Sequence, residues 1–175
     1  PALPADEPHQ YNTEVDVAAE PTLDGYRFSG WTTSDADVSG NSFTMPAKNV
    51  TFTGSWEATE FLLTINYVYE NGTKAAEPHT EKVQCNKTYS VTSPTVDGYA
   101  ADQLVVSGTM PAEPVTVTVT YTKRSDLSYT VNYYWNGTTD KAAESKVVND
   151  QTFDAVVTEY PIAIEGYTPV SNDSK

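Results

Sequence analysis

The chain has 175 residues and a formal net charge of −14, with 24 acidic residues against 10 lysines and arginines. Affinity for nucleic acid depends on lysine and arginine side chains that neutralise phosphates, so this charge balance excludes a nucleic-acid-binding role. An anionic membrane surface is disfavoured for the same reason, and no apolar run in the sequence is long enough to cross a bilayer. The composition therefore predicts a solvated surface, with neither nucleic-acid binding nor membrane insertion.

One sequence unit recurs along the chain. The segments Thr44–Ala47 and Thr109–Ala112 both read Thr-Met-Pro-Ala, and they lie 65 residues apart. A second marker, an acidic residue followed by Gly-Tyr, occurs three times, at Asp24–Tyr26, Asp97–Tyr99 and Glu165–Tyr167. A fixed period of this kind predicts an array of repeats, an architecture that is rarely an enzyme.

The markers divide the chain into three segments. We expect residues 1–58 to be the tail of a first repeat, residues 59–124 to be a complete repeat, and residues 125–175 to be the head of a third; these are called repeat one, repeat two and repeat three below. In repeat one, the alternating residues 14–18 and the run 50–56 predict strands joined by polar, glycine-containing loops.

Repeat two contains the full set of predicted elements. Residues 61–69 are rich in β-branched and aromatic residues, which favour a strand, and the Asn71–Gly72 pair that follows predicts a hairpin turn. Residues 82–91 predict a second strand, and residues 93–98 predict a turn or a helical turn. The alternation of Val and Thr over 115–121 predicts a last strand with one buried and one solvated face.

Repeat three matches only the first part of repeat two. Residues 129–135 correspond to the first strand, Asn136–Gly137 repeats the turn, and no Met-Pro-Ala or closing strand follows Tyr167. By the same comparison, repeat one has no opening strand. An unpaired strand edge leaves a row of backbone donors and acceptors open. We therefore hypothesise that the two partial repeats pair by strand addition, within one chain or between chains.

Two families share these motifs. The aromatic, Gly and Pro residues of repeat one resemble the Listeria–Bacteroides repeat, also called the internalin-type B repeat, and the opening strands with their Gly-Tyr partners resemble the mucin-binding (MucBP-like) repeats. The resemblance implies a β-rich α+β fold, built from tandem small β-grasp-like modules with mixed sheets and at most a short helix. The residues that carry it are Gly25–Thr33, Met45–Ala47 and Asn49–Trp56 for the first family, and Leu63–Gly72 with Asp97–Tyr99 and Tyr129–Gly137 with Glu165–Tyr167 for the second.

The resemblance also implies a function. Repeats of these families occur in bacterial surface proteins, so we expect non-catalytic stalk or spacer repeats of an extracellular adhesin on the bacterial cell surface, attached to the cell wall through regions outside this chain. The alternative is that the repeats themselves bind host mucin glycans or a host surface protein. We expect no cofactor and no bound metal.

The aromatic residues near the hairpin turns are the best candidates for a ligand surface. Tyr134 and Trp135 are consecutive, so their side chains must point to opposite faces of a strand. An exposed Tyr or Trp ring can stack on a sugar while its polar group stays hydrated. We therefore predict ligand contacts at Tyr134, Trp135 and, in the corresponding place of repeat two, Tyr69.

Other chemistry has weaker support in the sequence. Cys85 is the only cysteine, and the aligned repeats have Tyr11 and Asn149 at its position, so neither a disulfide nor a catalytic thiol is expected. The acidic loop with Asp35 and Asp37 lacks the residue spacing of an EF-hand, and solvated acids are the simpler interpretation than calcium ligands.

Overall fold

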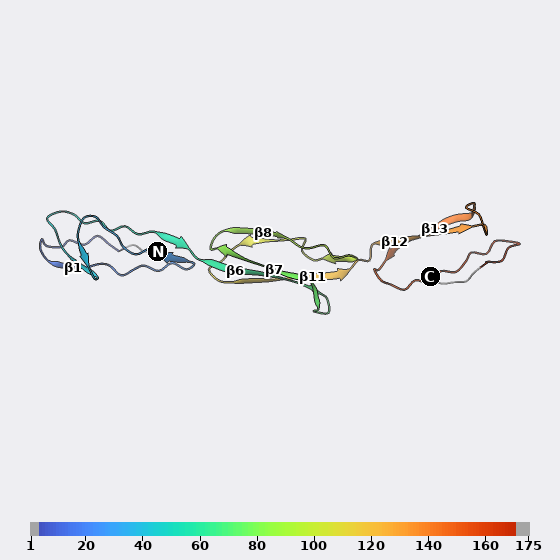
Figure 1. The fold of residues 1–175 in the computed structure, drawn as a ribbon, viewed down its shortest axis with the longest axis horizontal. Helices are drawn as coiled ribbons and strands as arrows, with labels where there is room; N and C mark the ends of the chain where they lie inside the picture. The colour runs from blue at the N-terminus through green and yellow to red at the C-terminus, as the bar shows by residue number, and fades with distance from the viewer. Residues whose placement is uncertain (1–3, 171–175) are drawn as a thin grey trace. The chain divides into compact units, whose positions relative to one another are not determined.

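The computed structural model describes residues 4–170, and its secondary structure consists of strands, turns and loops (Figure 1). Those residues contain no helix, so the α+β part of the predicted fold class is wrong and the described chain is all-β. Residues 93–98 form an irregular segment that ends in a turn; Pro94 and the β-branched residues after it favour extended backbone. None of the described residues belongs to a helix that is long and apolar enough to cross a membrane.

The strands fall into the three predicted segments, whose outer ends at 1–3 and 171–175 lie outside the described residues. Repeat one holds β1 (Glu14–Asp16), β2 (Tyr26–Phe28), β3 (Val38–Ser39), β4 (Ser42–Thr44) and β5 (Trp56–Ala58). Repeat two holds β6 (Glu60–Tyr69), β7 (Lys74–Gln84), β8 (Thr88–Thr92), β9 (Tyr99–Ala101), β10 (Val105–Thr109) and β11 (Val115–Lys123). Repeat three holds β12 (Leu127–Tyr134) and β13 (Lys141–Gln151).

One predicted strand is two strands in the structure. The sequence predicts a single strand over 82–91, whereas β7 ends at Gln84 and β8 begins at Thr88. Asn86 lies between them with a φ of 63°, a left-handed conformation that asparagine tolerates better than most residues, and the Lys87 N–H donates back to the Gln84 carbonyl at 3.0 Å to close a turn. The strands predicted over 61–69 and 115–121 are present as β6 and β11. The strand predicted over 50–56 is wrong: β5 begins only at Trp56, and before it Thr53 makes an isolated bridge with Thr32.

The contacts divide the chain into two compact units. The first comprises Pro1–Asn66, Glu77–Thr92 and Val105–Thr118, and the second comprises Tyr67–Ala76, Ser93–Leu104 and Val119–Lys175. Strands β6, β7 and β11 have residues in both units. The hydrogen-bonded order of the largest sheet is β7-β6-β11-β9, and β10 pairs with β8 in a separate two-stranded sheet.

In the first unit, apolar side chains from repeats one and two are buried. The rings of Phe43 and Phe52 lie 5.4 Å apart, in a tilted arrangement that aromatic pairs favour. Met110 is fully buried, as are Leu63 and Ile65 on one face of β6. The buried side chains of this unit are Val15, Phe43, Leu63, Ile65, Cys85, Val106 and Met110.

In the second unit, the buried side chains come from β6 and β11. Tyr67, Val119 and Tyr121 are at most 3% exposed, and the rings of the two tyrosines make an edge contact with centroids 6.4 Å apart. The Tyr121 hydroxyl donates a hydrogen bond to the backbone carbonyl of Pro94. Burial raises the pKa of both tyrosines, because the phenolate would lose its hydration.

The Thr-Met-Pro-Ala motif has a structural explanation. At the end of β10, Met110 donates its N–H to the Lys87 carbonyl at 2.8 Å and accepts the Asn86 N–H at 2.9 Å. The first copy makes the same pair of bonds, from Met45 to Thr13 and from Asn12 to Met45, at 2.8 and 2.9 Å. The methionine thus joins the strand end to a left-handed asparagine turn, and the following proline cannot continue the ladder.

Repeats one and two share their strand register. The pair β1·β4 of repeat one corresponds to the pair β8·β10 of repeat two, and β2·β5 corresponds to β9·β11. All four pairs are antiparallel. The equivalent partners are Glu14 with Thr44 and Thr88 with Thr109, and Phe28 with Trp56 and Ala101 with Tyr121.

Repeat three is a single antiparallel hairpin followed by a segment without strands (Figure 1). Its register shifts between Leu127 and Tyr129, opposite Asp150, whose φ is 56°. No residue between 125 and 170 is buried. Within residues 125–170 the hairpin has no strand equivalent to β11 beside it, and an isolated two-stranded hairpin is only marginally stable in water.

We predict that Met110→Ala lowers the free energy of unfolding by roughly 2–5 kcal/mol, because it removes a fully buried side chain and leaves a cavity. Leu104→Ala is the matched control, since Leu104 is 74% exposed and its truncation opens no cavity. Urea unfolding of the two variants measures the difference. Equal losses for both variants would contradict the assignment of Met110 to the core.

Candidate functional site

The predicted ligand residues Tyr134 and Trp135 lie beside one pocket. Tyr134 is the last residue of β12 and is 52% exposed, while Trp135 begins the loop that follows. The pocket has a volume of about 530 Å³, and both aromatic residues line it together with Pro161, Ile162, Ile164 and residues 167–170. Tyr69 does not line this pocket. The structure therefore brings together two of the three predicted residues.

Trp135 is engaged in a ring pair. Its centroid lies 4.5 Å from that of Tyr167, the tyrosine of the third Gly-Tyr marker. Tyr69 makes the corresponding contact in repeat two, 4.7 Å from Tyr99. Because the same pair recurs at the same place, the ring contact has a structural role in each repeat, and Tyr134 remains the aromatic residue with a free face.

The Gly-Tyr marker of repeat two contacts repeat three. Gly98 has a φ of 77°, and a Cβ placed on it would lie 2.3 Å from Cγ of Phe153. The Gly98 carbonyl accepts the Arg124 N–H at 2.9 Å, and the Arg124 carbonyl accepts the Phe153 N–H at 2.8 Å. The Phe153 ring also contacts Tyr99, with centroids 5.7 Å apart. We call this set of contacts a junction.

The same junction joins repeats one and two. Gly25 has a φ of 79°, and a Cβ on it would lie 2.2 Å from Sγ of Cys85. The Gly25 carbonyl accepts the Thr59 N–H at 2.8 Å, and the Thr59 carbonyl accepts the Cys85 N–H at 2.9 Å. In addition, the Asn86 side-chain amide donates to the Tyr26 hydroxyl at 3.0 Å. In both junctions one linker residue, Thr59 or Arg124, donates its N–H to the glycine of one repeat and accepts an N–H from the next repeat.

The junctions correct the alignment of Cys85. The residue of repeat three in its place is Phe153, not Asn149, because the Phe153 N–H donates to the Arg124 carbonyl as the Cys85 N–H donates to the Thr59 carbonyl. The left-handed Asp150 lies in β13 where the register shifts between Leu127 and Tyr129, so the repeats do not keep a constant spacing up to this point. Cys85 is buried against Gly25, where its thiol packs as a small apolar side chain.

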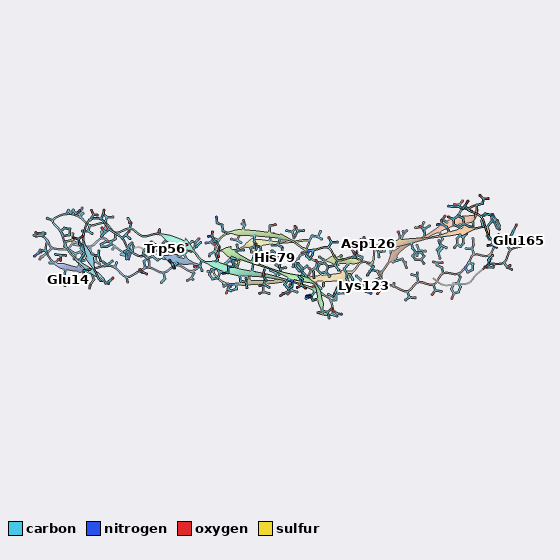
Figure 2. The ribbon with its side chains drawn as sticks, viewed as in Figure 1. Glu14, Trp56, His79, Lys123, Asp126 and Glu165 are labelled. Atoms are coloured by element: carbon cyan, nitrogen blue, oxygen red, sulfur yellow. The ribbon has the colours of Figure 1, made fainter. Side chains whose placement is uncertain are left out.

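Charged side chains connect the linker after β11 to repeat three. Lys123 and Asp126, both labelled in Figure 2, flank Arg124. The Arg124 guanidinium binds the Asp126 carboxylate in a bidentate pair, with both N–O distances 2.9 Å. Lys123 Nζ lies 3.3 Å from the Asp154 carboxylate. Exposed pairs of this kind contribute little to stability, but they restrict the linker that forms the junction.

A second polar cluster holds the strandless segment of repeat three. Lys146 Nζ lies 2.9 and 3.0 Å from the two carboxylate oxygens of Glu159, and the Tyr129 hydroxyl donates to the same carboxylate. The hydrogen bond from Lys146, followed by that from Tyr129, lowers the pKa of Glu159. The bond to Glu159 in turn raises the pKa of Lys146 and of Tyr129.

The acidic loop of repeat one is held by internal bonds. Asp35 accepts the Thr51 N–H at 3.0 Å and lies 3.3 Å from Lys48 Nζ. The bond from Thr51 is the main cause of the lowered pKa of Asp35, and the bond from Lys48 adds to it. No group of three His, Cys, Asp or Glu side chains suited to a metal ion occurs among residues 4–170.

Sequence reasoning missed the junction partners. The three Gly-Tyr markers are visible in the sequence, but Gly98 and Phe153 meet only through the fold. The glycine recurs in all three Gly-Tyr markers, and a recurrent glycine indicates either a positive φ or a neighbouring group that leaves no room for a Cβ.

Two parts of the chain match family models. Residues 63–122 match the MucBP domain, and residues 4–60 match the divergent InlB B-repeat domain. Both family resemblances inferred from the sequence are therefore confirmed for these residues.

One curated protein and one solved structure are similar to parts of this chain. Internalin J of Listeria monocytogenes is 32% identical over 135 residues, which cover 75% of this chain and 14% of that protein. A solved type 2 repeat of the mucus binding protein MUB from Lactobacillus reuteri is 23% identical, with 58% of this chain and 77% of the other covered at a TM-score of 0.33. The chain thus spans a small part of the length of the curated relative.

We predict that Gly98→Ala disrupts the junction. A Cβ there would collide with the Phe153 ring, and the positive φ would strain any other residue. Gly72→Ala is the matched control, because Gly72 has a φ of 80° but nothing within 4 Å of a Cβ. The control should cost about 1–2 kcal/mol of unfolding free energy from backbone strain, and Gly98→Ala roughly 1–3 kcal/mol more from overpacking.

Urea unfolding measures these costs, and the ¹H NMR shifts of the Phe153 ring report the junction itself. Ring shifts that stay unchanged in Gly98→Ala would contradict the assigned contact.

We also predict a pH effect at Glu159. Because the pKa of Glu159 is lowered in the folded state, its ionised carboxylate stabilises the fold at pH values above the unfolded-state pKa. This stabilisation is lost as the pH falls through the folded-state pKa. Lys146→Met should return the titration midpoint of the Glu159 carboxyl toward its ordinary value, as followed by ¹³C NMR. Lys141→Met is the control, since Lys141 bonds to Ser145 instead. Equal midpoints in the two variants would show that Lys146 does not cause the shift.

Proposed function

We propose that this chain, with its MucBP repeat at residues 63–122 and its divergent InlB B-repeat at residues 4–60, is a spacer segment of a bacterial cell-surface adhesin. The observation that carries the proposal is the recurring junction. The same glycine contact and the same two backbone hydrogen bonds occur at Gly25 and at Gly98. A connection that is repeated in this way suits an array whose role is to hold other domains apart.

The proposal includes the division into repeats at 1–58, 59–124 and 125–175 and a β-grasp-like topology for a complete repeat. It places the chain outside the cell, attached to the cell wall through regions other than this chain. The net charge of −14 suits an array of repeats, because mutual repulsion keeps acidic repeats solvated. The role is non-catalytic.

A second candidate function is direct binding of host mucin glycans or a host surface protein. The observation that favours it is the half-exposed Tyr134 ring beside the pocket of about 530 Å³ that Trp135 also lines. A ring with one free face can stack on a sugar. On this hypothesis Tyr134 makes the contact, Trp135 shapes the pocket, and Tyr69 belongs to the ring pair of repeat two.

Binding to a mucin and glycan array distinguishes the two functions. A spacer predicts no saturable binding by the chain at high concentration. Direct recognition predicts saturable binding that Tyr134→Ala weakens by about tenfold or more, which corresponds to a loss of roughly 1.4 kcal/mol of binding free energy. Tyr160→Ala is the control, because Tyr160 is 79% exposed and does not line the pocket.

The spacer role has its own test. Replacing this segment in the parent adhesin by unrelated repeats of equal length should preserve adhesion of the bacterium to its target. Adhesion that is lost with the replacement, but restored by this segment alone, would contradict the spacer role and support direct recognition.

A further inference from the structure

The sequence Asn-Gly-Thr occurs at two hairpin tips, and its backbone conformation differs between them. In repeat two it occupies Asn71–Thr73, between β6 and β7, and in repeat three it occupies Asn136–Thr138, between β12 and β13. Both asparagines are exposed, as are the glycines that follow them. Two copies of one tripeptide have the same intrinsic chemistry, so a difference in reactivity between them comes from the fold.

In repeat two the N–H of Gly72 is part of the turn. It donates to the Tyr69 carbonyl at 2.8 Å, and the Tyr69 N–H donates to the Thr73 carbonyl at 2.8 Å. Gly72 has a φ of 80°, whereas the φ of Asn71 is not positive. Asn71 is therefore the third residue of a type I turn that a left-handed glycine completes, a common three-residue hairpin loop.

In repeat three the asparagine lies one position earlier in the turn. The Thr138 N–H donates to the Trp135 carbonyl at 3.0 Å, so Asn136 and Gly137 are the two central residues. Gly137 has a φ of 74° and the φ of Asn136 is not positive, which is the pattern of a type II turn. The Gly137 N–H has no hydrogen-bonding partner among residues 4–170.

The two asparagine side chains differ in the same way. Oδ1 of Asn71 accepts the Thr73 N–H at 3.0 Å and the Thr73 hydroxyl at 2.6 Å. The Thr138 hydroxyl instead donates to the Trp135 carbonyl at 3.0 Å, and within the described part of the chain the Asn136 carboxamide has no hydrogen bond. Thr73 thus restricts rotation of the Asn71 side chain, and no such bond restricts the side chain of Asn136.

We propose that Asn136 is a site of spontaneous deamidation and that Asn71, in the same tripeptide, is protected by its turn. The Gly137 nitrogen gives its proton to a base in the solvent and attacks Cγ of Asn136. The side-chain amide group takes up a proton and leaves as ammonia, and a five-membered succinimide ring remains. Water then opens the ring at either of its carbonyl carbons, which gives aspartate or isoaspartate. Water is the only co-reactant, and no electrons are transferred.

The hydrogen bonds of repeat two oppose this reaction. Attack requires the glycine nitrogen to lose its proton and to come close to the asparagine side chain. In repeat two the bond from the Gly72 N–H to Tyr69 must break first, and the bonds from Thr73 to Asn71 must break as the side chain turns. Repeat three has no equivalent of these bonds among its described residues. Breaking them raises the barrier, so we expect Asn71 to react at least about tenfold more slowly than Asn136.

Deamidation changes the tip of the β12–β13 hairpin in two ways. It replaces a neutral amide by a carboxylate, in a loop that already contains Asp140. Isoaspartate also inserts one carbon atom into the main chain between Trp135 and Gly137, within the turn that the backbone bonds of Trp135 to Thr138 and Asp140 close. The inference depends on neither the location nor the spacer role proposed above, because it concerns only the two turns.

Incubation of the full chain at neutral pH, followed by peptide mapping with mass spectrometry, measures both rates in one sample. The peptide with Asn136 should acquire the mass of a carboxylate, as aspartyl and isoaspartyl products, at least about tenfold faster than the peptide with Asn71. The same incubation in urea is the control, because both tripeptides are then unfolded and should react at nearly equal rates. Equal rates in the folded chain, or a faster reaction at Asn71, would overturn the proposal.

Exchange of the two loops separates the effect of the turn from the stability of each hairpin. In one variant, Glu70–Thr73 is replaced by the sequence Asn-Gly-Thr-Thr-Asp of residues 136–140, and the transplanted asparagine should deamidate at least about tenfold faster than Asn71 does. In the matched variant, residues 136–140 are replaced by Glu-Asn-Gly-Thr, and deamidation in repeat three should slow by a similar factor. If each asparagine instead keeps the rate of its repeat, hairpin stability controls the reaction and the proposal is wrong.

Discussion

Pairing of a closing strand against β6 is the constraint on which the buried core depends. β11 lies beside β6 in the sheet order, and Tyr67, Val119 and Tyr121 are buried where the two strands meet in the second unit. Among residues 125–170, the opening hairpin of repeat three has no such strand beside it, and none of these residues is buried. The opening hairpin alone therefore does not form a core; the strand that closes the sheet does.

Small repeats of this kind bury little surface by themselves, so their neighbours matter. At each junction a glycine with positive φ lets the chain come close to the next repeat, where Cys85 or Phe153 fills the space. Backbone bonds through one linker residue complete the contact. The contact tolerates a thiol in one junction and a phenyl ring in the other because it depends on the missing Cβ of the glycine. This explains why the glycine recurs while its partner varies.

The sequence predicts the strands well where the pattern is local. The β-branched run of β6 and the alternation of β11 identify both strands, and the Asn-Gly pairs identify the hairpin turns. The predicted strand over 82–91 was wrong because one left-handed residue, Asn86, divides it. The placement of Phe153 opposite Gly98 depends on a bulge at Asp150, and no local pattern in the sequence reveals it. The pocket beside Trp135 depends on long-range pairing in the same way.

Hydrogen–deuterium exchange of the full chain at low concentration tests the central claim most directly, because it reports the stability of each strand separately. If a closing strand creates the core, the amides of β6 and β11 exchange much more slowly than those of β12 and β13. If the amides of β12 are protected to the same degree as those of β6, the opening hairpin is stable without its closing strand, and the account is contradicted.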